Sequence, residues 1–305
     1  MHEIAARLLY VSAAAFMRLP WPWLRALADA LAALWLRADA REARVARRNL
    51  ALIGPDWPPA EREALLRAVL RSTAAQLFET LRLWTRPQAD NLRLVRAMHG
   101  TAAFDRAIAA GRGVIVAAPH HGNWELLNQW LAAHTPLAIL YRPPESKVGE
   151  AFLRIVRAHG ERVTQVRAEA RGVRELFRIL KAGGVVGILP DQQPRAHGGD
   201  GVLAPFFGLP TYTMTLLGRL AERSGATVLF AWCERVDEAP AFDLHLAPAP
   251  AGIDSSDAVE SATAVNVAVE AIARRDLAQY QWTYKRFRLK PSRDGGENPY
   301  RDLRQ

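Results

Sequence analysis

The sequence predicts an α/β fold, a mainly parallel mixed sheet with helices on both faces, preceded by an N-terminal helical, membrane-associating region. Two observations support this prediction. From residue 101 onward, short apolar runs of strand length alternate with segments of helical periodicity. Before that point the periodicity is helical throughout, and tryptophan is frequent. We expect the helical region at 1–95, the α/β domain at 96–290 and a tail at 291–305.

The composition narrows the class of protein. The chain has 305 residues and is 50% hydrophobic, which suffices for one large core. Its net charge is +9, and all but four of its 40 basic residues are arginine. Such a surface suits anionic lipid, nucleic acid or an acidic carrier protein, and composition does not choose among them. The single cysteine, Cys233, excludes a disulfide framework and lies in an apolar run that predicts a buried strand.

The first 36 residues predict two helices, separated by Pro20–Trp21–Pro22. Their apolar stretches, between Arg7 and Arg18 and between Arg25 and Arg37, are shorter than the roughly 20 residues that a spanning helix needs. We expect the first helix to lie in a membrane interface, where tryptophan is favoured. The alternative is that both helices simply pack on the rest of the domain.

Two further helical patterns follow before the α/β part begins. Four arginines from Arg37 to Arg48, at spacings of four, three and four, form a basic stripe on one helix face. This stripe predicts either a solvated face or contact with anionic lipid. Apolar residues from Leu66 to Trp84 then repeat at helical spacing and predict a long amphipathic helix. We expect this helical region to cap the domain that follows.

The α/β part alternates strands and helices in chain order. The predicted strands cover 114–118, 137–141, 162–166, 185–189, 227–232 and 242–246, the last two as neighbours. The predicted helices cover 104–110, 146–158, 170–180, 213–223 and 259–272, with Gly160 ending the second. The glycine-rich segment Arg195–Gly208 is expected to be irregular.

The most informative stretch is the turn at 119–123, between the strand at 114–118 and a helix that begins at Trp124. It lies at the carboxyl end of a strand, where open α/β sheets bind their ligands. Glu125 falls in the first turn of the helix. We expect its carboxylate to hold Nδ1–H of His120, which leaves Nε2 free to act as a general base.

Other polar residues are expected at the same edge of the sheet. Arg142, Asp191 and Gln192 each follow a predicted strand, and the ends of parallel strands converge on one cleft. Asn123 is predicted to cap the new helix, and the backbone amides beside it suit an oxyanion or a phosphate. We therefore take these four residues as substrate-binding candidates beside His120.

Several common catalytic motifs are absent from the sequence. It contains no G-x-S-x-G elbow, no H-E-x-x-H zinc pattern, no P-loop and no G-x-G-x-x-G after a strand. We expect no metal and no cofactor, with metal binding by His120, His121 and Glu125 as a weaker alternative. Because no nucleophile has an obvious partner, the residues favour a direct transfer. His120 would deprotonate an acceptor hydroxyl as that hydroxyl attacks an acyl carbonyl.

The run from His120 to Glu125 resembles the H-x4-D/E signature of glycerolipid acyltransferases. Its form resembles the late lipid A biosynthesis acyltransferase family, the lauroyl and myristoyl transferases. The resemblance covers nearly the whole chain and includes Tyr141–Arg142–Pro143, Pro190–Asp191–Gln192–Gln193–Pro194, Pro205–Phe206–Phe207–Gly208 and Gln281–Arg288. H-x4-E alone is moderately specific, whereas the whole set in this order is strong.

The resemblance implies an O-acyltransferase of lipopolysaccharide biosynthesis, at the cytoplasmic face of the inner membrane. It implies acyl transfer from acyl carrier protein, or from acyl-coenzyme A, to a hydroxyl of a lipid A precursor or related glycolipid. The membrane surface is then a partner and nucleic acid is not. The resemblance assigns the base to His120 and the orienting carboxylate to Glu125, with Arg142, Asp191 and Gln192 at the substrate site.

Three alternatives remain open from the residues. The chain could acylate another lipid, such as a lysophospholipid or an aminolipid. It could hydrolyse acyl esters, which requires no acceptor other than water. It could also be a non-enzymatic module that binds lipid or nucleic acid through its arginine surface. Acyl chain length depends on the depth of a pocket and is not encoded in these motifs.

Overall fold

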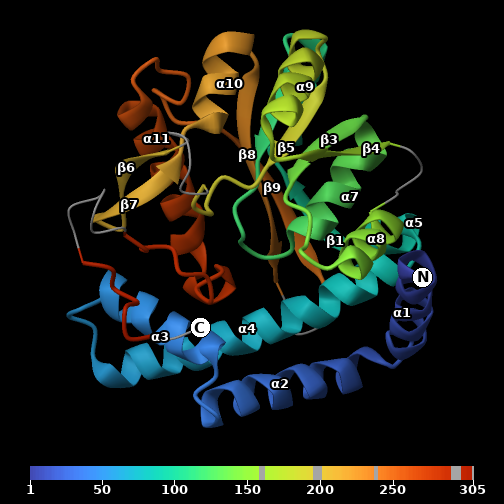
Figure 1. The fold of residues 1–305 in the computed structure, drawn as a ribbon, viewed down its shortest axis with the longest axis vertical. Coiled ribbons are helices and arrows are strands. Elements are labelled where there is room, and N and C mark those ends of the chain that lie inside the picture. Colours follow the sequence, from blue (N-terminus) through green and yellow to red (C-terminus); the bar gives the residue numbers. More distant parts are fainter. Residues whose placement is uncertain (158–161, 195–200, 237–239, 290–296, 304–305) are drawn as a thin grey trace.

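The computed structural model describes residues 1–303 except 158–161, 195–200, 237–239 and 290–296. Five helices come first: α1 (His2–Phe16), α2 (Trp21–Arg37), α3 (Arg41–Ile53), α4 (Pro59–Thr85) and α5 (Gln88–Leu92). The long α4 runs beneath the sheet, with α2 packed along it and α1 at one end (Figure 1). The two helices predicted for the first 36 residues and the long helix predicted around 66–84 are confirmed.

A seven-stranded sheet forms the centre of the molecule, in the order β1-β9-β8-β2-β5-β3-β4. Every neighbouring pair is parallel except β8 and β9, which confirms the predicted mainly parallel, mixed sheet. The strands are β1 (Val95–His99), β2 (Val114–Ala117), β3 (Leu137–Tyr141), β4 (Val163–Arg167), β5 (Val185–Ile188), β8 (Thr227–Arg235) and β9 (Phe242–Pro248). All four residues of β2 are buried, as are all four of β5, which explains their unbroken apolar sequences.

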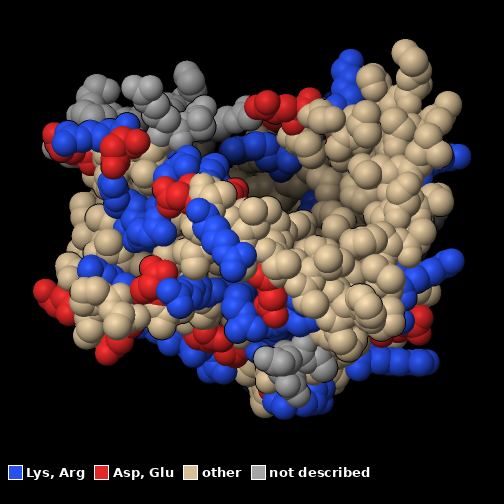
Figure 2. Space-filling model, turned by 90° about the horizontal axis from the view of Figure 1, so that it is seen from below, with Lys and Arg blue, Asp and Glu red and all other residues tan. Residues whose placement is uncertain are grey.

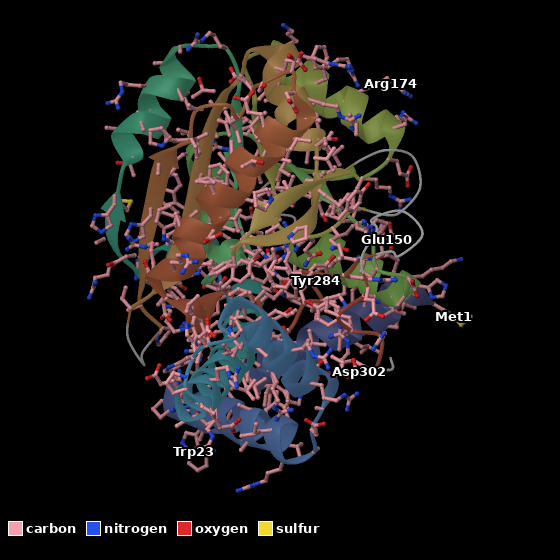
Figure 3. The ribbon with its side chains drawn as sticks, turned by 90° about the vertical axis from the view of Figure 1, so that its left-hand side faces the viewer. Met1, Trp23, Glu150, Arg174, Tyr284 and Asp302 are labelled. Carbon is pink, nitrogen blue, oxygen red and sulfur yellow. The ribbon has the colours of Figure 1, made fainter. Side chains whose placement is uncertain are left out.

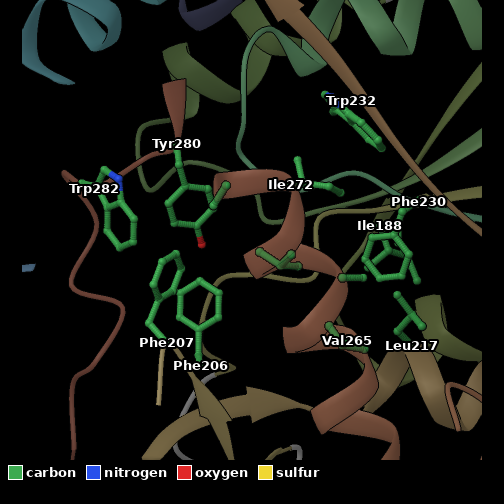
Figure 4. Close-up of a cluster of buried hydrophobic side chains, with 14 of the residues drawn as sticks. Ile188, Phe206, Phe207, Leu217, Phe230, Trp232, Val265, Ile272, Tyr280 and Trp282 are labelled. Carbon is green, nitrogen blue, oxygen red and sulfur yellow. The ribbon is translucent and has the colours of Figure 1, made fainter. Parts of the chain in front are cut away.

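Helices cover both faces of this sheet, as expected from the alternation of strands and helices. They are α6 (Thr101–Ala109), α7 (Trp124–His134), α8 (Lys147–Val156), α9 (Ala170–Lys181), α10 (Leu216–Ser224) and α11 (Ala258–Arg275). The core on one face includes residues of α9, α10 and α11, and the core on the other includes residues of α6 and α7. Figure 4 shows part of the first core, where the aromatic rings of Phe206, Phe207, Tyr280 and Trp282 pack together. Cys233 is fully buried in β8, as predicted.

Three features differ from the sequence-based expectation. β1 is not predicted at all. The described part of Arg195–Gly208 is not irregular, because β6 (Gly201–Phe206) pairs antiparallel with β7 (Leu209–Met214). Helix α10 consequently begins at Leu216 and not at residue 213, which belongs to β7. The predicted stop at Gly160 lies outside the described residues.

The C-terminal segment connects the helical region to the sheet. Asn49 on α3 donates hydrogen bonds to the carbonyl oxygens of Trp282 and Tyr284, at 2.6 and 2.8 Å. Tyr300 is buried and donates its hydroxyl hydrogen to Asn49 Oδ1. Arg48 forms an ion pair with Asp302. The predicted arginine stripe is divided between two helices, because Arg37 ends α2 and the other three arginines lie on α3. Its α3 part is partly engaged by the C-terminal segment, so it is not simply a solvated face.

In the part of the chain that the structure describes, no helix has the length and apolar character to cross a membrane. Helices α1 and α2 nevertheless expose apolar side chains: Ile4, Leu8, Leu9, Val11, Phe16, Trp23, Leu27 and Leu34. Seen from this side, the surface has a broad area free of charged residues (Figure 2). Both helices also bury small residues against the domain, such as Ala6 and Ala28. Both helices therefore pack on the rest of the domain through one face, while the apolar residues of the other face are exposed; contact of that face with a membrane remains a prediction.

Candidate active site

The turn between β2 and α7 has a defined backbone shape. Gly122 has φ +59°, a conformation that side chains other than glycine rarely adopt. A Cβ atom built on Gly122 would lie 2.0 Å from the carbonyl oxygen of Cys233 in β8. The next amide, of Asn123, donates to that same oxygen at 2.8 Å. The close approach of the turn to β8 therefore requires glycine, and it fixes the position of the residues on either side.

His120 is oriented by Asp191, which follows β5. The imidazole Nδ1 lies 2.7 Å from Asp191 Oδ1, and the backbone N–H of His120 donates to Oδ2 at 2.9 Å. The Asp191 side chain is only 2% exposed. Burial by itself raises the pKa of Asp191, but the electrostatic interaction with the adjacent imidazole of His120 and the two hydrogen bonds from that residue lower it overall. Asp191 is therefore a carboxylate at neutral pH, and it accepts the proton of Nδ1.

The other ring nitrogen of His120 is left as an acceptor. Since Nδ1 carries the hydrogen, Nε2 holds a lone pair, and the side-chain amide of Gln192 donates to it at 3.2 Å. The same amide nitrogen donates to Oε1 of Gln281, also at 3.2 Å. The His120 side chain remains 11% exposed, and its ring meets Trp124 edge to face. This arrangement presents an unprotonated Nε2, as a general base requires.

The predicted contact between Glu125 and His120 is wrong. Glu125 is buried at the start of α7 and accepts a hydrogen bond from Arg157, which follows α8. The guanidinium of Arg157 also lies over the ring of Trp84. The cause is helix geometry: a residue in the first turn of α7 projects sideways toward α8, whereas Asp191 reaches His120 from the adjacent strand end. The carboxylate partner of the base comes from β5 and not from the H-x4-E motif.

Asn123 is the N-cap of α7, as predicted. Its Oδ1 accepts from the amide of Leu126 at 3.2 Å, and its Nδ2 donates to Glu79 of α4 at 3.3 Å. The side chain is fully buried. We therefore withdraw Asn123 from the substrate-binding candidates. Glu79 in turn forms a buried ion pair with Arg235, which ties α4 to the end of β8.

Arg142 lies apart from His120, on the wall of a neighbouring cavity of about 530 Å³. Pro194, two residues beyond Gln192, lines the same cavity. The intervening Gln193 is held by the hydroxyl of Tyr284, which accepts from its backbone amide at 2.9 Å. Arg142 and Pro194 thus line one cavity, while Asp191 and Gln192 are the substrate candidates that contact the imidazole directly.

The metal-binding alternative is not supported by this geometry. The Nδ1 atom of His120 is engaged by Asp191, and Glu125 is engaged by Arg157. His121 is fully buried, and neither of its ring nitrogens has a hydrogen-bond partner among the described residues. Burial lowers its pKa to about 4. His121 is therefore a neutral packing residue at pH 7, consistent with a structural role.

Two residues near the base were missed from the sequence. Gln281 holds the amide of Gln192, and the Tyr280 phenol interacts with Asp191. Burial and that neighbouring carboxylate raise the pKa of Tyr280 far above its usual range, so the phenol stays protonated. Both residues lie near the C-terminus, at the start of a segment that is rich in aromatic and basic residues. They are about 160 residues from His120 along the chain, so no local sequence spacing relates them to that histidine. The antiparallel bridge between His121 and Tyr280 brings the two segments together.

Comparison with known proteins adds the family. A family model described as "Bacterial lipid A biosynthesis acyltransferase" matches residues 3–289. The chain is 28% identical to the lipid A biosynthesis palmitoleoyltransferase of Escherichia coli over 280 residues, which cover 90% of this chain and 88% of the relative. It is 26% identical to the E. coli lipid A biosynthesis lauroyltransferase, with the same coverage. It is also 29% identical to a phosphatidylinositol mannoside acyltransferase of Mycobacterium tuberculosis, over 61% of this chain and 60% of that protein.

Proposed function

Since the chain belongs to the bacterial lipid A biosynthesis acyltransferase family and is an acyltransferase, we propose that it transfers a fatty acyl group from an acyl thioester to a hydroxyl of a lipid A precursor. The donor is an acyl carrier protein or coenzyme A thioester. His120 is the general base, and Asp191 replaces Glu125 as the residue that orients it. The observation that carries this proposal is the buried 2.7 Å contact between His120 Nδ1 and Asp191 Oδ1.

The proposed reaction uses both ring nitrogens of His120. The acceptor hydroxyl occupies the place of the Gln192 amide beside Nε2, which removes its proton as the oxygen attacks the thioester carbonyl. The imidazolium that forms is stabilised by the Asp191 carboxylate on Nδ1. The C–O bond forms, the C–S bond breaks, and the proton passes from Nε2 to the departing thiolate. An ester and a free thiol are the products.

The displaced amide of Gln192 has a further role in this proposal. One of its N–H bonds is directed to Gln281 and the other to His120 Nε2. When a hydroxyl takes over Nε2, the second N–H is released and can donate to the carbonyl oxygen as negative charge develops there. Arg142, on the wall of the adjoining cavity, is proposed to meet an anionic group of a substrate.

We further propose that the enzyme works at the cytoplasmic face of the inner membrane. The exposed apolar residues of α1 and α2 support attachment by insertion into the bilayer interface, without a spanning helix. We propose that a lipid acceptor reaches the site from the same end of the molecule, since α4, on which α2 packs, also contacts the turn that carries His120.

The test is acyl transfer in vitro by the purified chain, with a lauroyl thioester and a lipid A precursor, followed by mass spectrometry of the lipid. We expect His120→Ala to lower turnover by about 100-fold or more, and His99→Ala, at an exposed histidine of β1, to leave it unchanged. Turnover by His120→Ala at the wild-type rate would contradict the proposal.

A different glycolipid acceptor is the second candidate, and the similarity to phosphatidylinositol mannoside acyltransferases favours it. Mass spectrometry of total lipid from a strain that lacks this chain separates the two. Loss of one acyl mass from lipid A supports the first acceptor. Unchanged lipid A with an altered glycolipid supports the second, and release of free fatty acid in vitro without any acylated lipid would instead indicate a hydrolase.

A further inference from the structure

A groove of about 700 Å³ lies between α9 and α10. Its floor is apolar and includes Phe177 and Leu220. Its rim carries five arginines: Arg171, Arg174, Arg178, Arg219 and Arg223. The site described above uses none of these residues.

Four arginines of this groove are available to an external partner. Arg171, Arg174, Arg178 and Arg223 are exposed and form no ion pair or side-chain hydrogen bond with any residue that the structure describes. The only carboxylates within α9 and α10 themselves are Glu175 and Glu222. Arginines that find no internal partner and surround an apolar floor make a surface suited to an acidic protein, because charge steers the encounter and the floor accepts an apolar side chain.

The groove leads toward the candidate active site. It shares Val173, Leu216 and Arg219 with the cavity that Arg142 and Pro194 also line. Pro194, which lines that second cavity, lies two residues beyond Gln192, which contacts His120. A ligand seated between α9 and α10 could therefore extend a flexible arm through the second cavity to the base.

The position of the groove argues against a lipid occupant. Arg174 on α9 and Trp23 on α2 lie at opposite ends of the molecule in Figure 3. Figure 1 likewise shows α9 and α10 at the opposite end of the molecule from α2. If the apolar face of α1 and α2 rests on a bilayer, the arginine groove points away from it and is accessible to a soluble protein.

We propose that the α9–α10 groove is the docking site for an acidic acyl carrier protein that brings the acyl thioester on a flexible prosthetic arm. This inference rests on the proposed function, since it assigns the donor of that reaction. The acidic surface of the carrier faces the arginine rim, the arm passes through the second cavity, and the thioester reaches His120. Docking by arginines on a rim predicts an affinity that falls steeply with salt.

The test is a charge reversal, Arg174→Glu with Arg178→Glu, measured by the binding of fluorescently labelled lauroyl-acyl carrier protein. The matched control is Arg106→Glu with Arg112→Glu, two exposed arginines in and after α6, on the opposite face of the sheet. We expect the groove variant to raise the Kd about tenfold or more at low salt, and the control to change it less than twofold. At high salt the wild type should approach the groove variant. Turnover with a small soluble thioester, lauroyl-pantetheine, should be the same in all three proteins.

The outcomes separate this inference from the proposed function. Equal affinities of the groove variant and the control would overturn the docking site, as would no binding of the carrier by the wild type. Loss of binding to anionic phospholipid vesicles, with carrier affinity unchanged, would reassign the groove to lipid. Failure of the wild type to acylate a lipid with lauroyl-pantetheine would count against the proposed function, whatever the carrier binding shows.

Discussion

At the residue scale, the functional unit is a histidine with a different partner on each nitrogen. A carboxylate that accepts a proton from Nδ1 fixes the tautomer and stabilises the charge that appears when Nε2 takes a proton. Asp191 supplies this carboxylate from a position where water has little access, so its interaction with His120 is strong. The amide of Gln192 cannot serve in that role, because it donates to Nε2 and carries no charge.

We predict that Asp191→Asn lowers kcat about 100-fold or more while the fold is retained. Asparagine has nearly the same shape and can still accept the backbone N–H of His120, but its neutral amide does not stabilise an imidazolium. The control is Asp243→Asn, which removes a carboxylate that pairs with Arg96 in β1. Steady-state kinetics and thermal unfolding of both variants check the prediction. Equal loss of kcat in the two variants would argue against a special role for Asp191.

Because His121 is buried and neutral, we predict that the free energy of unfolding depends on pH. Its pKa is lowered by burial to about 4, against about 6.5 in the unfolded chain, so between these values the unfolded state binds more protons. Stability therefore falls as pH falls. For this one group the loss is about 2 kcal/mol between pH 7.5 and pH 5.

The variant that isolates this effect is His121→Phe, which does not titrate. It sacrifices no hydrogen bond, because neither ring nitrogen of His121 has a partner among the described residues. Urea unfolding at pH 7.5 and pH 5 measures the difference. We expect the variant to lose about 2 kcal/mol less than the wild type over that interval. Parallel losses in both proteins would show that other groups account for the acid sensitivity.

The sequence predicted where the base lies, but it predicted the wrong carboxylate as the partner of that base. His120, Asp191 and Gln192 were all expected at converging strand ends, and they do meet, because parallel topology determines where strand ends lie. The choice between Glu125 and Asp191 depends on the direction in which the first turn of α7 projects. Spacing along the chain does not contain that information, since it depends on the tertiary structure that brings Arg157, after α8, to Glu125.

At the scale of elements, the Glu125–Arg157 pair joins the start of α7 to the end of α8. Glu125 is almost completely buried, and the side chain of Arg157 is 16% exposed. Such an ion pair makes a modest net contribution to the free energy of unfolding, because desolvation of the two charges offsets their attraction. The removal of one charge is costly, because it leaves the other charge buried without a partner. We therefore infer that Glu125 positions the elements around the site, and that it acts on His120 only through them.

We predict that Glu125→Gln lowers the free energy of unfolding by about 3 kcal/mol. The matched variant is Glu150→Gln, which removes a partially exposed ion pair between α8 and Arg167 and should cost about 1 kcal/mol or less. Urea titration of both variants gives the comparison. Wild-type stability in Glu125→Gln would mean that the pair does not hold the two helices together.

The β6–β7 hairpin shows why one pair of strands was missed. Its two-residue turn consists of Phe207 and Gly208, both with positive φ, at 50° and 73°. Hairpin turns of this kind usually carry asparagine or aspartate before the glycine. Here Phe207 is held by packing on Phe206, by an Arg274 guanidinium over its ring and by Glu270, which accepts its amide hydrogen. The turn is specified by contacts with α11, which lies about 60 residues away in the sequence.

At the scale of the whole molecule, two surfaces of opposite character lie at opposite ends. One end exposes apolar side chains of α1 and α2, and the other carries the arginine groove between α9 and α10. The strand ends that bear His120 and Asp191 lie between them, next to α4. A lipid acceptor and a protein-borne donor could then approach the base from different sides without competing for one entrance.

The apolar end leads to the last prediction, on membrane attachment. Ile4 and Leu8 are 65% and 64% exposed and lie one turn apart on the same face of α1. Burial of two such side chains in the bilayer interface contributes on the order of 2 kcal/mol, so Ile4→Ser with Leu8→Ser should weaken partition into phospholipid vesicles about tenfold or more. The control is Val259→Ser with Val267→Ser, two exposed valines of α11, which should not change it. Because insertion of apolar side chains is not screened by ions, high salt should not release the wild type from the vesicles. Release by salt, together with unchanged partition of the α1 variant, would instead assign attachment to the basic residues.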